Sequence, residues 1–273
     1  MNVPVPTPRS RLARLVELPE PEIELARAAL LIAAEEYPQL VPDLYLRRLD
    51  ILAERVRDRL ADETAPLIVL QEMSRVLFHE EGYRGNIDAY YDPRNSFLND
   101  VLDRRVGIPL TLAILYLEVG WRLSVPLEGV NFPGHFLVRH PGEAFGLLVD
   151  PFQRGEIRFE DQAAELLDRV YGGAVELKPE YLGSATKKDM LVRLLANLKD
   201  VYLNTRDEAR ALAAVERILL LRPVAEERRD RGMLLARAGR VDEALTDLRH
   251  YLESVPDAPD ATRVRLLLDE LSP

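Results

Sequence analysis

The sequence predicts an α+β protein, with a helical N-terminal half, a small antiparallel sheet and a final all-α segment. Three observations predict this class. Apolar residues recur at helical spacing from about residue 22 to about residue 123. Short β-rich segments bounded by Pro and Gly follow, up to about residue 159. After Lys187 the chain is helical again and repeats itself. A chain of 273 residues accommodates the two domains that these changes indicate.

The helical half contains five predicted helices, each opened or closed by a recognisable breaker. Pro21 precedes the first, Pro42 opens the second, Gly82 follows the third and Gly107 follows the fourth. Their approximate ranges are 22–37, 43–60, 65–79, 96–105 and 110–123. The last of these, LTLAILYLEVGWRL, is apolar almost all round, so we expect it to be the central buried helix.

Three short β-rich segments predict the sheet. They are LEGVNF, HFLVRH and FGLLVD, and they read as an antiparallel meander packed on the central helix. GEIRF adds one more candidate strand, and a helix is expected from Glu160 to Val170.

The domain boundaries follow from composition and from an internal repeat. We expect a disordered arm over 1–14, a first domain over 15–171, a linker over 172–186 and a repeat domain over 187–273. ARALAAVERILLLRP aligns with VDEALTDLRHYLESVP at an offset of 33, so that Ala211 matches Ala244. This period and the small residues at the helix crossing are typical of tetratricopeptide repeats, which usually bind a peptide or protein on a concave face. A capping helix is expected over 260–271.

Composition excludes several functions. A net charge of −10 argues against nucleic-acid binding. The absence of cysteine excludes disulfides, thiolate metal sites and a thiol nucleophile. With no apolar run of about eighteen residues and no export signal, we expect no membrane span and a cytoplasmic protein. No phosphate-binding glycine motif is present, so we expect no cofactor.

His135 and Asp150 are the first candidate site residues. If Pro141–Ala144 join two hairpin strands, His140 pairs with Phe145 and His135 directly faces Asp150. Such neighbours lie about 5 Å apart at Cβ, which suits a carboxylate that orients an imidazole. The alternative is a structural pair that pins the hairpin. A metal is not expected, because His135 and His140 would point to opposite faces of a strand.

A nucleophile for this pair would belong near the start of the buried helix, where Thr111 lies. The alternative is that Thr111 caps or packs. Upstream, RNSFLNDVLDRR carries Asn95, Asn99 and Arg105, which would either line a groove or form a solvated helix face.

A long part of the chain is similar to the transglutaminase-like core of a bacterial family. It runs from YYDPRNSFLNDVLDRRVGIPLTLA to GHFLVRH and continues with LLVDPF. The family is labelled after a regulator of invasion genes (SirB-type), and its members carry tetratricopeptide repeats after that core. The resemblance implies a papain-like arrangement, with a Cys at the start of a buried helix and His and Asp on adjacent strands. GIPLTLA puts Pro109 at the Cys position, while His135 and Asp150 match the other two.

Two functions follow from this comparison. The first is a non-catalytic interaction or regulatory module, since proline has neither a nucleophile nor an N–H. Its groove would be bounded by the three triad positions and lined by Asn95, Asn99, Arg105, Trp121 and Phe132, and its partner would be a protein or peptide. The alternative is a Cys-independent amide hydrolase, in which His135 and Asp150 activate water or Thr111.

Overall fold

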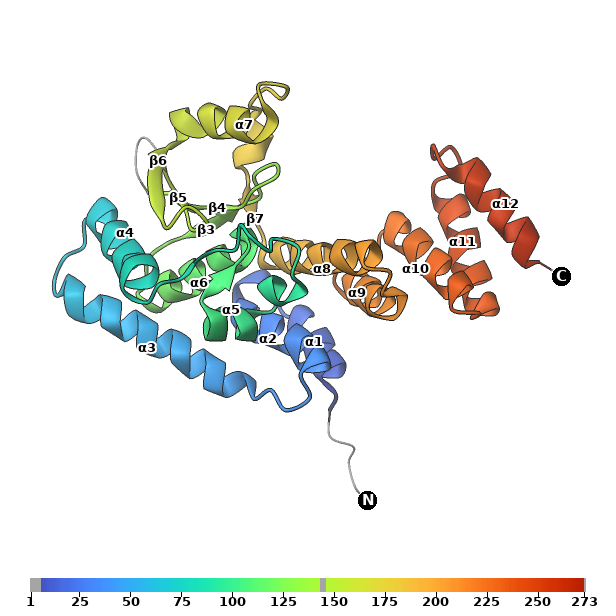
Figure 1. Ribbon diagram of the computed structural model, residues 1–273, viewed down its shortest axis with the longest axis horizontal. Coiled ribbons are helices and arrows are strands. Elements are labelled where there is room, and N and C mark those ends of the chain that lie inside the picture. The colour runs from blue at the N-terminus through green and yellow to red at the C-terminus, as the bar shows by residue number, and fades with distance from the viewer. Residues whose placement is uncertain (1–5, 143–145, 273) are drawn as a thin grey trace, which may run out of the picture. The chain divides into compact units, whose positions relative to one another are not determined.

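The computed structural model describes residues 6–142 and 146–272, and the chain divides into two compact units, Met1–Leu191 and Val192–Pro273 (Figure 1). The first unit combines helices with a small sheet, and the second is helical throughout its described residues. This confirms the α+β class followed by an all-α segment.

The helices of the first unit follow from two sequence features, which are proline residues at helix starts and apolar residues at helical spacing. Four of them carry Pro in their first turn, where its fixed φ and missing N–H cost nothing. Helix α6 buries every residue from Pro109 to Gly120 and is the central helix that the sequence predicts. The helices are α1 Pro8–Val16, α2 Leu25–Glu36, α3 Pro42–Leu60, α4 Pro66–Ser74, α5 Leu98–Arg104, α6 Pro109–Arg122 and α7 Ala163–Tyr171, with α4 running into a π-helix over Arg75–Glu80.

The main sheet has five strands in the order β6–β5–β4–β3–β7, all antiparallel. Leu137 and Leu148 pack with Leu166 and Leu167 of α7 in one buried cluster. Val138, on the opposite side by strand alternation, faces the side where α6 packs against β4. The strands are β3 Glu128–Val130, β4 Leu137–His140, β5 Leu147–Asp150, β6 Glu156–Phe159 and β7 Ser184–Ala185.

One polar cluster ties three of these strands together. Arg139 Nη2 lies 2.6 Å from Glu128 Oε2, and Ser184 also donates to that carboxylate. These hydrogen bonds from Arg139 and Ser184 hold the pKa of Glu128 below its ordinary value. The cluster therefore joins β3, β4 and β7 most strongly when the carboxylate is ionised.

A second, two-stranded parallel sheet was not predicted. β1 (Arg84–Gly85) pairs with β2 (Val106–Gly107), and Asn86 N–H donates to Gly107 O at 2.9 Å. Two-residue strands show too little alternation to be recognised in a sequence. This pairing places the segment at 84–86 beside the start of α6.

The predicted disordered arm over 1–14 is wrong for its described part. Residues 1–5 lie outside the described residues, but α1 begins at Pro8 and Thr7 caps it, accepting a hydrogen bond from Ser10 N. Leu12 is fully buried and Val16 nearly so, because their helical spacing gives α1 an apolar stripe that packs against α2.

The predicted linker over 172–186 is also wrong, because much of it belongs to the first unit. It contains a 3₁₀ turn at Pro179–Leu182 and strand β7, which pairs with β3. Val175, Leu177 and Tyr181 pack against the cluster under α7. Its Gly and Pro residues form turns within the first unit and not a flexible linker. The division between the two units falls after Leu191.

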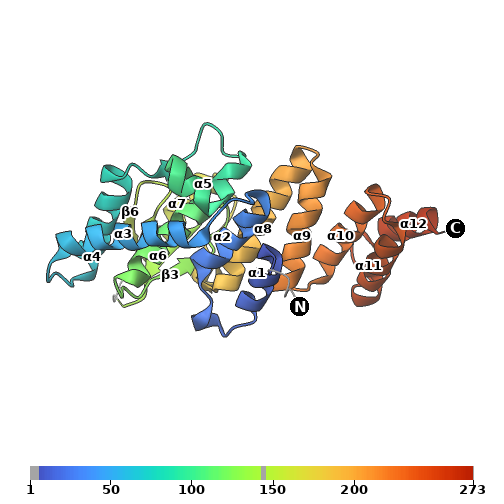
Figure 2. The same cartoon turned by 90° about the horizontal axis from the view of Figure 1, so that it is seen from below.

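The second unit is a row of helices in both views (Figures 1 and 2). The equivalent residues Ala211 and Ala244 are both fully buried, which fits the predicted repeat. A Cβ on Gly232 would lie 2.8 Å from Leu248 Cγ, so this glycine permits the close approach of α10 and α11. The helices are α8 Lys187–Asn204 (whose first turn belongs to the first unit), α9 Glu208–Leu221, α10 Ala225–Arg237, α11 Val241–Ser254 and α12 Ala261–Leu271.

Candidate functional site

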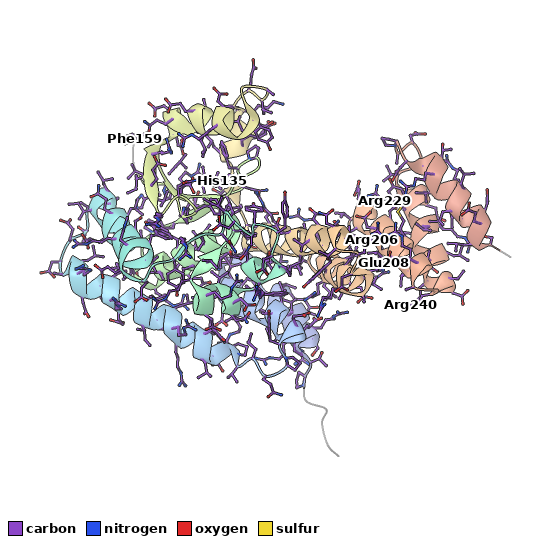
Figure 3. The ribbon with its side chains drawn as sticks, in the orientation of Figure 1. His135, Phe159, Arg206, Glu208, Arg229 and Arg240 are labelled. Atoms are coloured by element: carbon purple, nitrogen blue, oxygen red, sulfur yellow. The ribbon has the colours of Figure 1, made fainter. Side chains whose placement is uncertain are left out.

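His135 and Asp150 form a buried pair at the end of the sheet. His135 lies in the turn that precedes β4 (Figure 3). Asp150 is the last residue of β5. His135 Nε2 lies 2.9 Å from both Asp150 Oδ1 and Oδ2, with the two residues 8% and 1% exposed. Since a carboxylate only accepts, Nε2–H is the donor. Nδ1 is therefore the imidazole nitrogen left to take a proton, which is the arrangement a general base needs.

The register that we predicted for this hairpin is wrong by two residues. His140 pairs with Leu147 rather than with Phe145, and Val138 pairs with Val149. The connection is therefore longer than four residues, and β4 begins only at Leu137, so His135 lies in the turn before the strand. A shift of two residues preserves the face of each side chain, because the strand period is two. His135 and Asp150 therefore interact through their side chains where β4 begins and β5 ends, and they are not a pair in the β4–β5 ladder.

The Asp150 carboxylate also builds the turn that follows it. Its Oδ1 accepts from the backbone N–H groups of Phe152 at 3.0 Å and Gln153 at 3.1 Å. An aspartate that bonds the backbone two residues on is a recognised turn-forming arrangement. One carboxylate thus holds both the imidazole and the loop after β5.

Phe152, on that loop, covers the imidazole. Its ring meets the His135 ring edge-to-face, with centroids 5.9 Å apart. The same ring lies against the backbone of β1, where a Cβ on Gly85 would come within 2.5 Å of Phe152 Cε2. The glycine therefore lets the ring lie over β1, in contact with the His135 ring, which is largely buried.

The start of α6 carries no free nucleophile. Pro109 is the first residue of the helix and is buried. Thr111 is fully buried, its hydroxyl accepts from Ile108 N at 3.1 Å, and it donates to Asn95 O at 2.8 Å. Thr111, the third residue of the helix, therefore satisfies the N–H of the N-cap residue Ile108, which fits the capping alternative that the sequence left open.

Two residues predicted to line a groove do not do so. Asn95 is fully buried, with its Nδ2 donating to Ala89 O at 2.7 Å and its Oδ1 accepting from Asn86 Nδ2 at 2.9 Å. Phe132 is fully buried in the cluster under α7. An asparagine before a helix and an aromatic in a strand-rich segment each have a packing role that sequence cannot tell from a binding role.

The other three predicted groove residues lie at separate places. Asn99 is 5% exposed, and its buried Oδ1 has no hydrogen-bond partner among the residues that the structure describes. Arg105 ends α5 with a left-handed φ of 59° and pairs with Glu81 at 3.0 Å. Trp121 donates from Nε1 to Leu127 O at 2.9 Å and lines a different cavity, which contains neither His135 nor Asp150.

Sequence reasoning missed an exposed segment beside the pair that carries Ile87, Tyr90 and Tyr91, and we call these three residues the aromatic patch. Ile87 is 75% and Tyr91 72% exposed. Tyr90 meets Tyr91 at 5.3 Å and Phe152 at 6.2 Å between ring centroids, so ring contacts continue from the surface to His135. The run NIDAYY carried the signal, since two tyrosines and an isoleucine in a turn are seldom needed for a turn alone.

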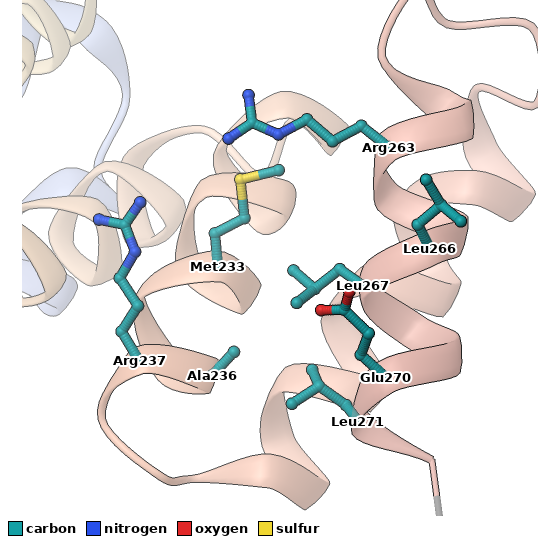
Figure 4. Close-up of a pocket in the computed structure, with 8 residues that line it drawn as sticks. All are labelled: Met233, Ala236, Arg237, Arg263, Leu266, Leu267, Glu270 and Leu271. Carbon is teal, nitrogen blue, oxygen red and sulfur yellow. The ribbon is translucent and has the colours of Figure 1, made fainter.

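The second unit has its own cavity, of about 490 Å³, between α10 and α12. Met233 of α10 and Leu267 and Leu271 of α12 point into it (Figure 4). Arg237, Arg263 and Glu270 add charge to its lining, and Leu266 on the same helix is 60% exposed. We call this the α10–α12 cavity.

Within 6–142 and 146–272, no three His, Asp or Glu side chains converge as metal ligands would. No helix in the same ranges is both long enough and apolar enough to cross a bilayer.

Comparison with known families accounts for both units. The transglutaminase-like superfamily matches residues 43–196, and a tetratricopeptide-repeat family matches residues 198–269. Residues 43–196 include Pro109, His135 and Asp150. No solved structure matches the chain.

Similar proteins occur in several bacteria. A UPF0162 protein of Xylella fastidiosa is 38% identical over 262 residues, covering 94% of this chain and 93% of its own. One of Pseudomonas aeruginosa is 34% identical over 250 residues, covering 91% of each. The human F-box only protein 21 is 44% identical over 84 residues, which cover 31% of this chain and 13% of that protein. The chain therefore belongs to the bacterial UPF0162 (SirB-type) family of transglutaminase-like proteins with tetratricopeptide repeats.

Proposed function

We propose that this protein is a non-catalytic transglutaminase-like protein that acts as an interaction or regulatory module. The observation that carries the proposal is the start of α6. Pro109 stands where the resemblance puts the catalytic Cys, and the nearby Thr111 hydroxyl is buried and bonded to two backbone groups. A thiol mechanism has no nucleophile here, and a hydroxyl mechanism would have to break the helix cap.

The His135–Asp150 pair has a structural role in this proposal. Asp150 orders the turn that carries Phe152, and Phe152 in turn covers His135. The pair thereby supports the aromatic patch through the ring contact between Phe152 and Tyr90. Tyrosine side chains are among the typical anchors of protein interfaces.

The repeats supply a second surface. Tetratricopeptide stacks usually bind peptides or proteins, and the α10–α12 cavity combines an apolar lining with charged groups that would orient a peptide. A partner segment with an apolar side chain that enters between Met233 and Leu267 fits this lining.

A capture experiment with matched surface variants tests the binding claim. Leu266→Arg places a charge at the mouth of the cavity on a side chain that is 60% exposed, and Ile51→Arg makes the same change at 59% exposure on α3. We expect wild type and Ile51→Arg to retain the same partner from a lysate of the source organism, and Leu266→Arg to retain at least tenfold less. Equal retention by all three proteins, or no retained partner, would contradict the proposal.

The second candidate function is hydrolysis without a thiol, and the intact pair is what favours it. His135 Nδ1 could activate a water if Phe152 moved aside. Turnover of an amide or peptide library by wild type that disappears in His135→Ala would establish this function. We expect both proteins to give the same background rate.

A further inference from the structure

Helix α12 has two apolar faces, and they have different surroundings. Val264 is fully buried in a cluster with Leu248 and Tyr251 of α11. Leu266 lies on the opposite side of α12, because two residues turn a helix by about 200°, and it is 60% exposed. Leu266 and its neighbour Leu267 both line the α10–α12 cavity. The second apolar face of α12 is therefore open to a partner at this cavity.

Two opposite charges flank these leucines on the same face of α12. Arg263 lies three residues before the pair and Glu270 three residues after it, and both line the cavity (Figure 4). Across the cavity, Arg237 of α10 pairs with Glu208 at 3.1 Å. Neither Arg263 nor Glu270 makes an ion pair with any residue that the structure describes. Both charges are therefore available to groups of a partner.

The order of these four residues is complementary to its own reverse. A two-fold axis through the point between Leu266 and Leu267 pairs α12 with an antiparallel copy of itself. Arg263 of each copy then faces Glu270 of the other, and each Leu266 meets the Leu267 face of the second copy. A parallel pair would instead place like charges together, which disfavours it.

This complementarity selects a second copy of the chain as the occupant of the cavity. A peptide of another protein would have to reproduce a cation and an anion seven residues apart, about 10.5 Å along a helix, on either side of an apolar side chain. A second α12 has this arrangement in its own sequence. Leu266 also supplies the apolar side chain that the cavity accepts.

The expected strength of the association follows from the size of the contact. Exposed ion pairs contribute little to affinity and mainly fix register and orientation. Burial of Leu266 and Leu267 of both copies supplies the attraction. Because α12 has eleven residues, the contact is smaller than a standard protein interface, so a weak and reversible dimer is expected.

We propose that α12 is a self-association surface, on which a second copy of this chain docks with its own α12 antiparallel. Leu266 of each copy enters the α10–α12 cavity of the other, and each Arg263 pairs with Glu270. The inference rests on the proposed function, since it names the partner for a surface of the interaction module.

Sedimentation velocity of the purified full chain from about 5 to 500 µM, at low salt, tests the association. We expect the wild type to dimerise with a Kd of about 100 µM. Leu266→Arg should weaken the dimer more than tenfold, and Ile51→Arg, at the matched exposed position on α3, should leave it unchanged. A wild type that stays monomeric throughout, or a dimer that Leu266→Arg does not affect, would overturn the proposal.

Charge reversals test the antiparallel register. Arg263→Glu and Glu270→Arg should each weaken the dimer about tenfold, because each places like charges opposite one another. The double variant, which carries both changes, should return to within about threefold of wild type. Arg265→Glu makes the same charge change on α12 outside the cavity lining and serves as the control. A double variant as weak as the single ones contradicts the antiparallel pair.

The outcome for self-association can be separated from the outcome for the proposed function. A purified chain that stays monomeric, while Leu266→Arg still loses a different protein from the lysate, contradicts self-association and leaves the interaction module standing. A dimer that follows the charge reversals supports self-association whatever the lysate retains. Arg263, Leu266 and Glu270 are all exposed, so these variants should fold as the wild type does.

Discussion

Replacing Asp150 tests whether the buried pair has a structural role. Asp150→Ala removes the acceptor of three donors: His135 Nε2, Phe152 N and Gln153 N. The charge-assisted bond to His135 is worth about 1.5–3 kcal/mol, and each amide left without a partner costs about 1 kcal/mol. Together they predict a loss of about 4 kcal/mol in the free energy of unfolding of the first unit. Asp150→Asn keeps an oxygen acceptor for the turn and should cost only about 1–2 kcal/mol.

Urea unfolding followed by tryptophan fluorescence measures this loss in the right unit. The chain has one tryptophan, Trp121, and it lies in the first unit, so its signal is free of the repeat helices. The double variant of His135→Ala and Asp150→Ala should be more stable than the two single losses added together predict, by about 1.5–3 kcal/mol. A loss below about 1 kcal/mol in Asp150→Ala, or strict additivity in the double variant, would refute the structural role.

Three further changes have defined outcomes. Gly85→Ala puts a methyl group against the Phe152 ring and should cost about 1–3 kcal/mol in the same urea assay; a neutral result would mean that the ring moves freely. Ala61→Gly relieves a backbone at φ 49° and should raise the free energy of unfolding by about 1 kcal/mol, so a lower value would contradict the strain. Glu128→Gln should cost about 0.5 kcal/mol at pH 7, after allowance for solvent screening, because the bond to Arg139 loses its charge. Since Arg139 lowers the folded-state pKa of Glu128, this contribution is complete above the ordinary value near 4.5 and is lost as the pH falls through the lowered pKa. Unfolding curves of both proteins from pH 7 to pH 3 should therefore converge at low pH.

Helix bounds and helix burial could be predicted where the apolar periodicity and the flanking proline or glycine residues agreed. α3 begins at Pro42 and ends at Leu60, as predicted, because Pro42 sets its start and the apolar stripe continues without a break. α6 is buried all round because its residues are apolar all round. The pairing of repeat positions such as Ala211 and Ala244 follows from the same logic.

The features that sequence missed depend on distant partners. Strand β7 is two residues long and is a strand only because β3 offers it an edge. The hairpin register depended on a loop length that no residue near Pro141 specifies, and it was two residues from the prediction. The contact between Phe152 and Gly85 could not be predicted from the sequence, because these two residues are far apart in the chain.

The turn built by Asp150 changes how relatives of this protein should be judged. Because the carboxylate orders backbone amides as well as an imidazole, it stabilises the fold whether or not the pair takes part in any chemistry. A relative that keeps His and Asp at these two places has therefore retained a fold, and this is no evidence that it is an enzyme. Under the proposed function, the residue aligned with Pro109, and not this pair, would distinguish catalytic from non-catalytic members of the family.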